Sequence, residues 1–192
     1  MNWNPHNDYL IPILKGKKVL DVGCGDGNLL LKCDGDGIDM DPPPNSHPRV
    51  KRAKAEEYLP TIPPESYDVV TMIDVFEHLE KPEIVLREII RILKPNGLLI
   101  IRSPFVYETT AFAHADHKWT ILLCNFIALN AMLEKCGFEV VDYWHWLRWP
   151  ITPQIRFPIR HMKFCMWINT IFPFSVIRSV NVIAKKPAVA RE

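Results

Sequence analysis

The last quarter of this chain is almost free of acidic residues. From residue 143 to residue 191 there is no aspartate or glutamate, whereas eight lysines and arginines lie among many aromatic side chains. Residues 1–142 have the opposite balance, 21 acidic against 15 basic, and the whole chain carries a formal charge of +1. A basic, aromatic segment suits a membrane interface, an anionic substrate or a nucleic acid, and a plain lid or dimer face explains it equally well.

Signals of several other protein classes are also absent. None of the five cysteines forms a C-x-x-C pair or a metal-ligand spacing, which indicates reduced thiols and no bound metal. The N-terminus lacks a basic stretch followed by an apolar one, so no signal peptide is expected. The apolar stretch 164–177 is interrupted by Asn169, Pro173 and Ser175, which argues against a membrane span. We expect a cytoplasmic protein, with membrane contact through residues 148–178 as an open alternative.

The most informative segment is residues 19–27, Val-Leu-Asp-Val-Gly-Cys-Gly-Asp-Gly. A short β-type run leads into a turn with glycine at every second position, and apolar residues follow at 29–31. Glycines let the backbone turn sharply and approach a ligand closely, and the N–H groups of the next helix then face that ligand. The spacing differs from the dinucleotide pattern G-x-G-x-x-G. Asp21, just before the turn, suits a cofactor with a positive end and repels a pyrophosphate.

This Asp-x-Gly-x-Gly-x-Gly string resembles the first motif of class I S-adenosylmethionine-dependent methyltransferases, and the chain most resembles their small-molecule, type 11-like branch. Further segments follow in the family's order: Gly-Ile-Asp-Met-Asp at 37–41, a charged loop at 53–59, Ser-Tyr-Asp-Val-Val-Thr-Met-Ile-Asp-Val-Phe-Glu-His-Leu at 66–79, and Leu-Lys-Pro-Asn-Gly-Leu-Leu-Ile-Ile at 93–101. The resemblance covers most of residues 7–146 and, loosely, 180–186.

The resemblance implies S-adenosylmethionine as cofactor and S-adenosylhomocysteine as product. The implied cofactor-binding residues are Asp21, Gly23, Cys24, Gly25, Asp39, Met40, Ala55, Glu56, Asp74 and Val75. Asp39 would accept both hydroxyls of the ribose. Asp36 and Asp41 are rival carboxylates, because Asp39 follows Gly27 more closely than is usual in the family. The first helix should therefore be short, over residues 28–33, with a turn at 34–37 into the second strand.

The alternation of strand and helix patterns predicts a single α/β domain. Strands are expected at 18–22, 67–73, 98–102, 138–144 and 181–185, with helices at 83–93 and 122–135. By the resemblance this is a Rossmann-like, doubly wound, mostly parallel seven-stranded sheet with an antiparallel last strand. We divide residues 1–192 into an N-terminal helical region (1–17), a cofactor-binding core (18–146), a basic aromatic lid or interface segment (147–179) and a last strand (180–186).

Candidate catalytic residues lie in the loop after the fifth strand. His117 and His114 could take a proton from an attacking hydroxyl or amine near neutral pH, with Asp116 close by. A histidine that caps the next helix is a near-equal alternative for His117, and a metal site ranks low because no further ligands are evident. Glu77 and His78 belong to the family pattern, with a helix-start role as plausible as a catalytic one.

The reaction implied is in-line methyl transfer to a small-molecule or lipid-like acceptor. The amino-group methylases of the family carry Asn/Asp-Pro-Pro-Tyr/Phe after the fourth strand, whereas this chain has Asp-Val-Phe at 74–76, so nucleic-acid base chemistry is disfavoured. Two other functions remain open. One is an RNA or protein methyltransferase that docks through the basic segment, and the other is a non-catalytic module that binds the cofactor. Residues 148–178 could also form a homodimer contact.

Overall fold

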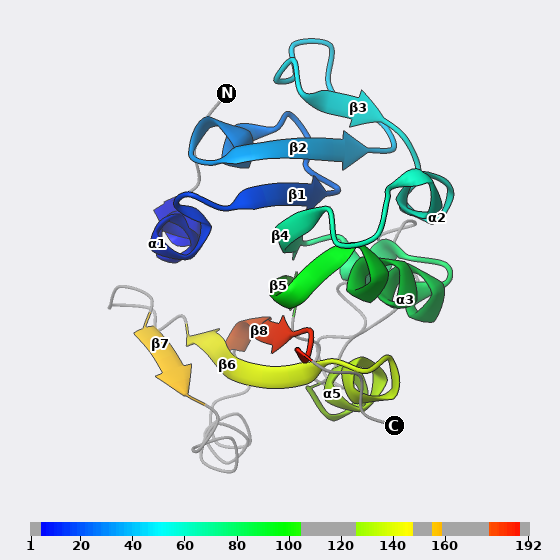
Figure 1. The fold of residues 1–192 in the computed structure, drawn as a ribbon. Coiled ribbons are helices and arrows are strands. Elements are labelled where there is room, and N and C mark those ends of the chain that lie inside the picture. Colours follow the sequence, from blue (N-terminus) through cyan, green and yellow to red (C-terminus); the bar gives the residue numbers. More distant parts are fainter. Residues whose placement is uncertain (1–4, 105–125, 148–154, 159–176, 189–192) are drawn as a thin grey trace.

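One mixed sheet organises the part of the chain that the structure describes, which in this computed structural model is residues 5–104, 126–147, 155–158 and 177–188. Its strand order is β3-β2-β1-β4-β5-β8-β6-β7, and Figure 1 shows β3 at one end and β7 at the other. The strands are β1 Lys18–Val22, β2 Asp34–Asp39, β3 Val50–Arg52, β4 Tyr67–Ile73, β5 Leu93–Pro104, β6 Glu139–Leu147, β7 Ile155–Pro158 and β8 Ile177–Lys185. Strands β1 to β5 pair in parallel, whereas β8 is antiparallel to both of its neighbours.

This topology confirms the predicted α/β fold with an antiparallel last strand. The first seven strands of the order are the predicted seven, and β1 and β4 have the predicted bounds. The eighth strand, β7, pairs with β6 at the edge of the sheet and comes from within the basic aromatic segment. No sequence pattern had indicated a strand there.

The helical elements cover both faces of the sheet. They are η1 Pro5–Leu10, α1 Ile11–Leu14, η2 Asn28–Leu31, α2 Ala55–Tyr58, η3 Leu59–Thr61, η4 Phe76–His78, α3 Pro82–Ile92 and α5 Phe126–Lys135, where η denotes a 3-10 helix. Apolar residues of α3 and α5 pack on one face, against side chains such as Leu20, Met72 and Ile101. Leu10 and Leu14 cover the other face with Val19, Val69 and Ile100. Alternate residues of a strand point to opposite faces, so β1, β4, β5 and β8 contribute to both clusters.

Helix α3 forms where the apolar periodicity placed it. Pro82 occupies its first turn, where a missing N–H has no cost, and Val85, Leu86, Ile89 and Ile92 are buried. The helix ends one residue earlier than predicted, because Leu93 already pairs with Tyr67 at the start of β5. The residues that we expected only to end the helix, 94–97, are an irregular part of that strand, in which Asn96 has a left-handed φ of 62°.

The segment after the glycine turn differs from the prediction. Residues 34–37 are not a turn but most of strand β2, and the first helix is only the 3-10 turn η2. The glycines there serve close packing, because a Cβ on Gly35 would lie 2.7 Å from the carbonyl oxygen of Val19, and one on Gly37 would lie 2.6 Å from the Sγ of Cys24. Strand β2 can lie this close to β1 and to the glycine turn only because residues 35 and 37 have no side chains.

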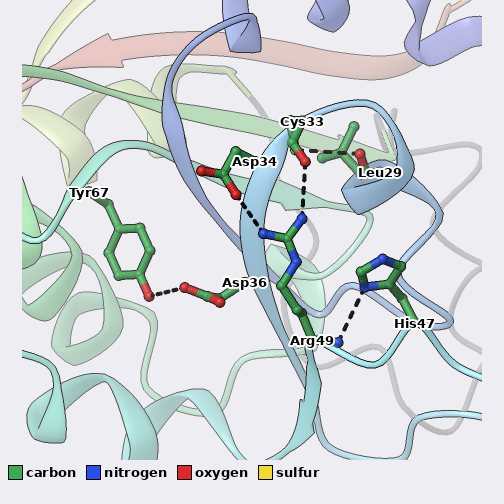
Figure 2. Close-up of polar contacts among 7 residues, drawn as sticks. All are labelled: Leu29, Cys33, Asp34, Asp36, His47, Arg49 and Tyr67. Carbon is green, nitrogen blue, oxygen red and sulfur yellow. Dashed lines mark hydrogen bonds and ion pairs between the residues drawn. The ribbon is translucent and has the colours of Figure 1, made fainter.

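Side chains tie the loop between β2 and β3 to its surroundings. Figure 2 shows the Arg49 guanidinium donating to the Asp34 carboxylate (2.6 Å) and to the Cys33 carbonyl (3.4 Å). The backbone N–H of Arg49 donates to Nδ1 of His47 at 3.2 Å (Figure 2). The backbone N–H of His47 donates to the carbonyl of Asp26 at 2.8 Å. These contacts hold the loop of residues 40–49 against the glycine turn and the start of β2.

Substitution of Gly35 tests the close approach of β2. Gly35→Ala should lower the free energy of unfolding by about 1–3 kcal/mol, because the methyl group would press on the rigid backbone of β1. Denaturant unfolding measures this. In the matched control Gly16→Ala, the backbone has φ of 70° but a Cβ would meet nothing within 4 Å, so only strain of about 1–2 kcal/mol is expected. A Gly35→Ala variant as stable as the wild type would contradict this account of β2.

Candidate functional site

Chemistry-bearing residues gather where the parallel strands end. The glycine turn follows β1, Asp39 ends β2, Asp74 follows β4, and Arg102 lies near the end of β5. Because β1, β2, β4 and β5 are parallel neighbours, their carboxyl ends meet at one edge of the sheet. In open α/β sheets this edge is the usual position of a ligand.

The glycine turn presses closely on its neighbours everywhere except at its centre. Gly23, Gly25 and Gly27 all have left-handed φ angles, of 70°, 55° and 79°. A Cβ on Gly23 would collide with the side chain of Val75, and one on Gly27 would lie 2.8 Å from the Cβ of His47. A Cβ on Gly25 would meet nothing within 4 Å. The open side of Gly25 is therefore where a ligand can approach the backbone.

Asp39 is the carboxylate that holds this turn. Its Oδ2 accepts the N–H of Gly25 (2.8 Å), and its Oδ1 accepts the N–H of Asp41 (2.8 Å). The rival Asp36 accepts the hydroxyl of Tyr67 (3.0 Å; Figure 2), and Asp41 forms an exposed ion pair with Arg52 (2.8 Å). Of the three carboxylates that the sequence offered, Asp39 is the one bonded to the glycine turn.

Asp21 is a buried carboxyl group below the same turn. Its Oδ1 accepts the hydroxyl of Thr71 at 2.6 Å. Burial raises the pKa of Asp21 to about 7, and the nearby carboxylate of Asp39 adds to the increase. The Thr71 hydrogen bond and the positive charge of Arg102 act in the opposite direction. A cation placed at this edge would therefore favour the ionised form of Asp21.

The other predicted cofactor residues follow the ends of β1, β2 and β3 in the chain. Cys24 is half-buried beside Gly37, and burial raises the pKa of its thiol far above the usual range, so it is no nucleophile. Met40 follows β2 and is exposed. Ala55 opens α2 and packs against the core, and Glu56 follows it in the first turn of α2.

Asp74, the residue that follows β4, combines a left-handed backbone with an ion pair. Asp74 has a left-handed φ of 57°, and both of its carboxylate oxygens accept from the guanidinium of Arg102. Glu77 is buried and accepts the hydroxyl of Ser103 (3.0 Å), and burial raises the pKa of Glu77. Sequence reasoning missed Arg102 and Ser103. The signal was there, as an arginine directly after the apolar run 98–101.

Some of the predicted residues cannot be placed in this site. His114, Asp116 and His117 lie outside the described residues, as do positions 148–154 and 159–176 of the basic aromatic segment. Within the described ranges, no three His, Cys, Asp or Glu residues are grouped so that they could hold a metal ion. No helix in those ranges is both long and apolar enough to cross a membrane.

Comparison with known proteins gives consistent matches. A family model described as a methyltransferase domain matches residues 7–143. The ubiquinone biosynthesis O-methyltransferase of Pseudomonas savastanoi pv. phaseolicola is 36% identical over 49% of this chain and 49% of its own length. The tRNA U34 carboxymethyltransferase of Hydrogenovibrio crunogenus is 30% identical over 67% of this chain and 46% of its own length. This chain thus spans about half the length of the curated relatives that it matches.

A solved structure extends the match in fold. The SAM-dependent methyltransferase from Archaeoglobus fulgidus superposes with a TM-score of 0.74 and covers 95% of this chain and 92% of its own. The two sequences are 22% identical, so this likeness shows a common fold.

The buried carboxyl group of Asp21 predicts a pH dependence of stability. The folded protein keeps a proton on Asp21 up to a pH of about 7, whereas the unfolded chain releases it near 3.8. The free energy of unfolding therefore falls as the pH rises through this window. Asp21→Asn removes the effect, so the variant should gain about 2–4 kcal/mol relative to the wild type between pH 4 and pH 8. Unfolding curves at both pH values measure the gain.

The control for this experiment is Glu57→Gln, which changes an exposed carboxylate of α2. Its stability should follow the wild-type curve across the same pH range. If the curves of Asp21→Asn and the wild type ran parallel between pH 4 and pH 8, Asp21 would not be the titrating group.

Proposed function

Because this chain belongs to the methyltransferase domain family, we propose that it transfers a methyl group from S-adenosylmethionine to a small-molecule or lipid-like acceptor. The observation that carries the proposal is the pairing of Asp39 with the glycine turn. It sets a carboxylate beside the open backbone face of Gly25, at the carboxyl edge of the sheet.

The residues at this edge fit an adenosyl sulfonium compound. Each oxygen of Asp39 accepts one backbone N–H and keeps lone-pair capacity, so both can also accept the two hydroxyls of a ribose. Asp74 adds negative charge near the end of β4, and a bound cation would favour the ionised form of Asp21 at the end of β1, which suits a ligand with an ammonium and a sulfonium group. A pyrophosphate would be repelled there.

The chemistry follows from what each partner supplies. The sulfonium of the bound cofactor makes its methyl group electrophilic. The protein has to hold the cofactor and the acceptor in line and to exclude water, and such positioning accounts for a large part of a rate enhancement. His117 and His114 remain our candidates for taking a proton from the acceptor.

Asp39 should be the carboxylate on which cofactor affinity depends. Asp39→Ala removes the ribose acceptors and releases the N–H of Gly25, so S-adenosylhomocysteine should bind about 10–100-fold more weakly, as for loss of a charged hydrogen bond. Isothermal titration calorimetry measures the affinity. Asp41→Ala, which removes an exposed carboxylate two residues away, should change it less than threefold. Equal losses in the two variants would reject Asp39 as the ribose ligand.

Two observations support a small-molecule acceptor. A relative of 36% identity is named as a ubiquinone biosynthesis O-methyltransferase, and the segment 74–76 lacks the amino-methylase motif. A second function, methylation of RNA, is favoured by the relative named as a tRNA carboxymethyltransferase and by the basic segment 148–178. In the first function, residues 148–178 would form a lid, a homodimer face or a membrane contact.

A labelling experiment separates the two functions. With methyl-tritiated S-adenosylmethionine, the protein should transfer label to members of a panel of small hydroxyl-bearing or lipid-like acceptors and not to bulk tRNA. An RNA enzyme that makes 6–10 phosphate contacts would instead lose about 10³–10⁵-fold in tRNA affinity between 50 and 200 mM salt. Label in tRNA together with that salt dependence would replace the small-molecule function with the RNA function. Saturable binding of S-adenosylhomocysteine with no transfer to any acceptor would favour the non-catalytic module.

A further inference from the structure

Arg102 is a buried cation at the carboxyl edge of the sheet. Only 10% of its side chain is exposed, although a buried charge is costly unless it is paired. Its Nε donates to Oδ1 of Asp74 at 3.2 Å, and its Nη2 donates to Oδ2 of the same carboxylate. The two bonds form a fork, which fixes the direction of the carboxylate as well as its distance.

The same residue also holds the backbone of Asp74. The N–H of Asp74 donates to the carbonyl of Arg102 at 2.8 Å, at the last registered pair of β4 with β5, Ile73 with Arg102. Asp74 thus has one backbone and two side-chain bonds to Arg102. These contacts offset the left-handed φ of 57°, which few residue types other than glycine adopt readily.

The position of Asp74 determines where the chain runs next. Val75 follows it directly, and the Val75 side chain packs on the Cα of Gly23 so tightly that no Cβ would fit there. A line of contacts therefore runs from Arg102 through Asp74 and Val75 to the first glycine of the turn. A shift of the β4 exit would move the surface on which the glycine turn rests.

The carboxylate of Asp74 remains accessible at the edge although it is paired with Arg102. The side chain of Asp74 is 48% exposed, whereas Arg102 lies below it. The Arg102 guanidinium is also close enough to Asp21 to act on it electrostatically, as is the carboxylate of Asp39. Asp74 therefore presents a fixed carboxylate outward, and its buried counter-ion sits on the protein side.

We propose that Arg102 is a positioning residue for the methyl donor, acting through Asp74 and Val75 on the cationic end of S-adenosylmethionine and on the glycine turn. This inference rests on the proposed function. It assigns to Arg102 a role in donor recognition that a purely structural ion pair would not have. A role in donor recognition means that a substitution of Arg102 changes donor affinity through Asp74, whereas a purely structural ion pair does not act on donor affinity in this way.

The same two strands supply a matched control. At the amino end of the pair, Lys94 of β5 forms an ion pair with Asp68 of β4 at 2.9 Å. This pair links β4 and β5 at the end of their pairing where Tyr67 pairs with Leu93. The glycine turn lies at the other end, where Ile73 pairs with Arg102. Lys94→Met thus removes an interstrand ion pair without touching the carboxyl edge.

The test is a double-mutant cycle on donor affinity. The variants Arg102→Met, Asp74→Asn and the double variant are titrated with S-adenosylmethionine and with S-adenosylhomocysteine, which lacks the sulfonium. Asp74→Asn should weaken S-adenosylmethionine at least tenfold and S-adenosylhomocysteine less. Arg102→Met should weaken S-adenosylmethionine about tenfold, and less than threefold once Asp74 is already asparagine. Lys94→Met should leave both affinities within threefold of the wild type.

Arg102→Lys keeps the experiment decisive if Arg102→Met fails to fold. Lysine retains the positive charge but not the fork, so this variant should fold and bind S-adenosylmethionine several-fold more weakly. Wild-type affinity in both folded Arg102 variants, or an Arg102→Met effect that adds fully to that of Asp74→Asn, would overturn the inference. If the wild-type protein bound neither compound, the proposed function itself would fail.

Discussion

The hydrogen bond from the N–H of Gly25 to the carboxylate of Asp39 joins the ends of β1 and β2, and the rest of the candidate site is arranged around it. The bond requires that β2 lie close to β1 and in parallel register, which Gly35 and Gly37 permit by leaving out side chains. It also requires a left-handed backbone in the turn, which the glycines supply. With Asp39 in place, the open face of Gly25 and the carboxylates at this edge are the features on which the proposed donor site depends.

The elements most predictable from the sequence are those whose signal is local. The apolar run of β4, the periodicity of α3 and the glycine turn after β1 all appear where the residues placed them. The resemblance to methyltransferases is confirmed by the family model, which matches residues 7–143. The doubly wound, mostly parallel sheet with an antiparallel last strand followed from that resemblance, whereas the order of the strands is known from the structure alone.

The remaining features depend on contacts between distant segments. Gly35 and Gly37 looked like turn residues, because a strand glycine is explained only by what packs against it. Strand β7 has no strand pattern of its own and is defined by pairing with β6. Arg102 could be seen at the end of an apolar run, but its partner lies 28 positions away and is fixed by the register of β4 and β5. The roles of Asp21, Asp39 and Asp74 toward a ligand stay predictions.

The tether of the loop 40–49 has a consequence for how the protein responds to its buffer. Arg49 and Asp34 form the ionic part of this tether, and their side chains are 40% and 84% exposed, so dissolved ions screen their attraction. A chain with a full first helix would support its glycine turn by packing, which ionic strength hardly affects. In this chain the ionic part of the support for the glycine turn weakens as the ionic strength rises, whereas the backbone bond from His47 to Asp26 does not, so the loop would account for part of a fall in donor affinity at high ionic strength.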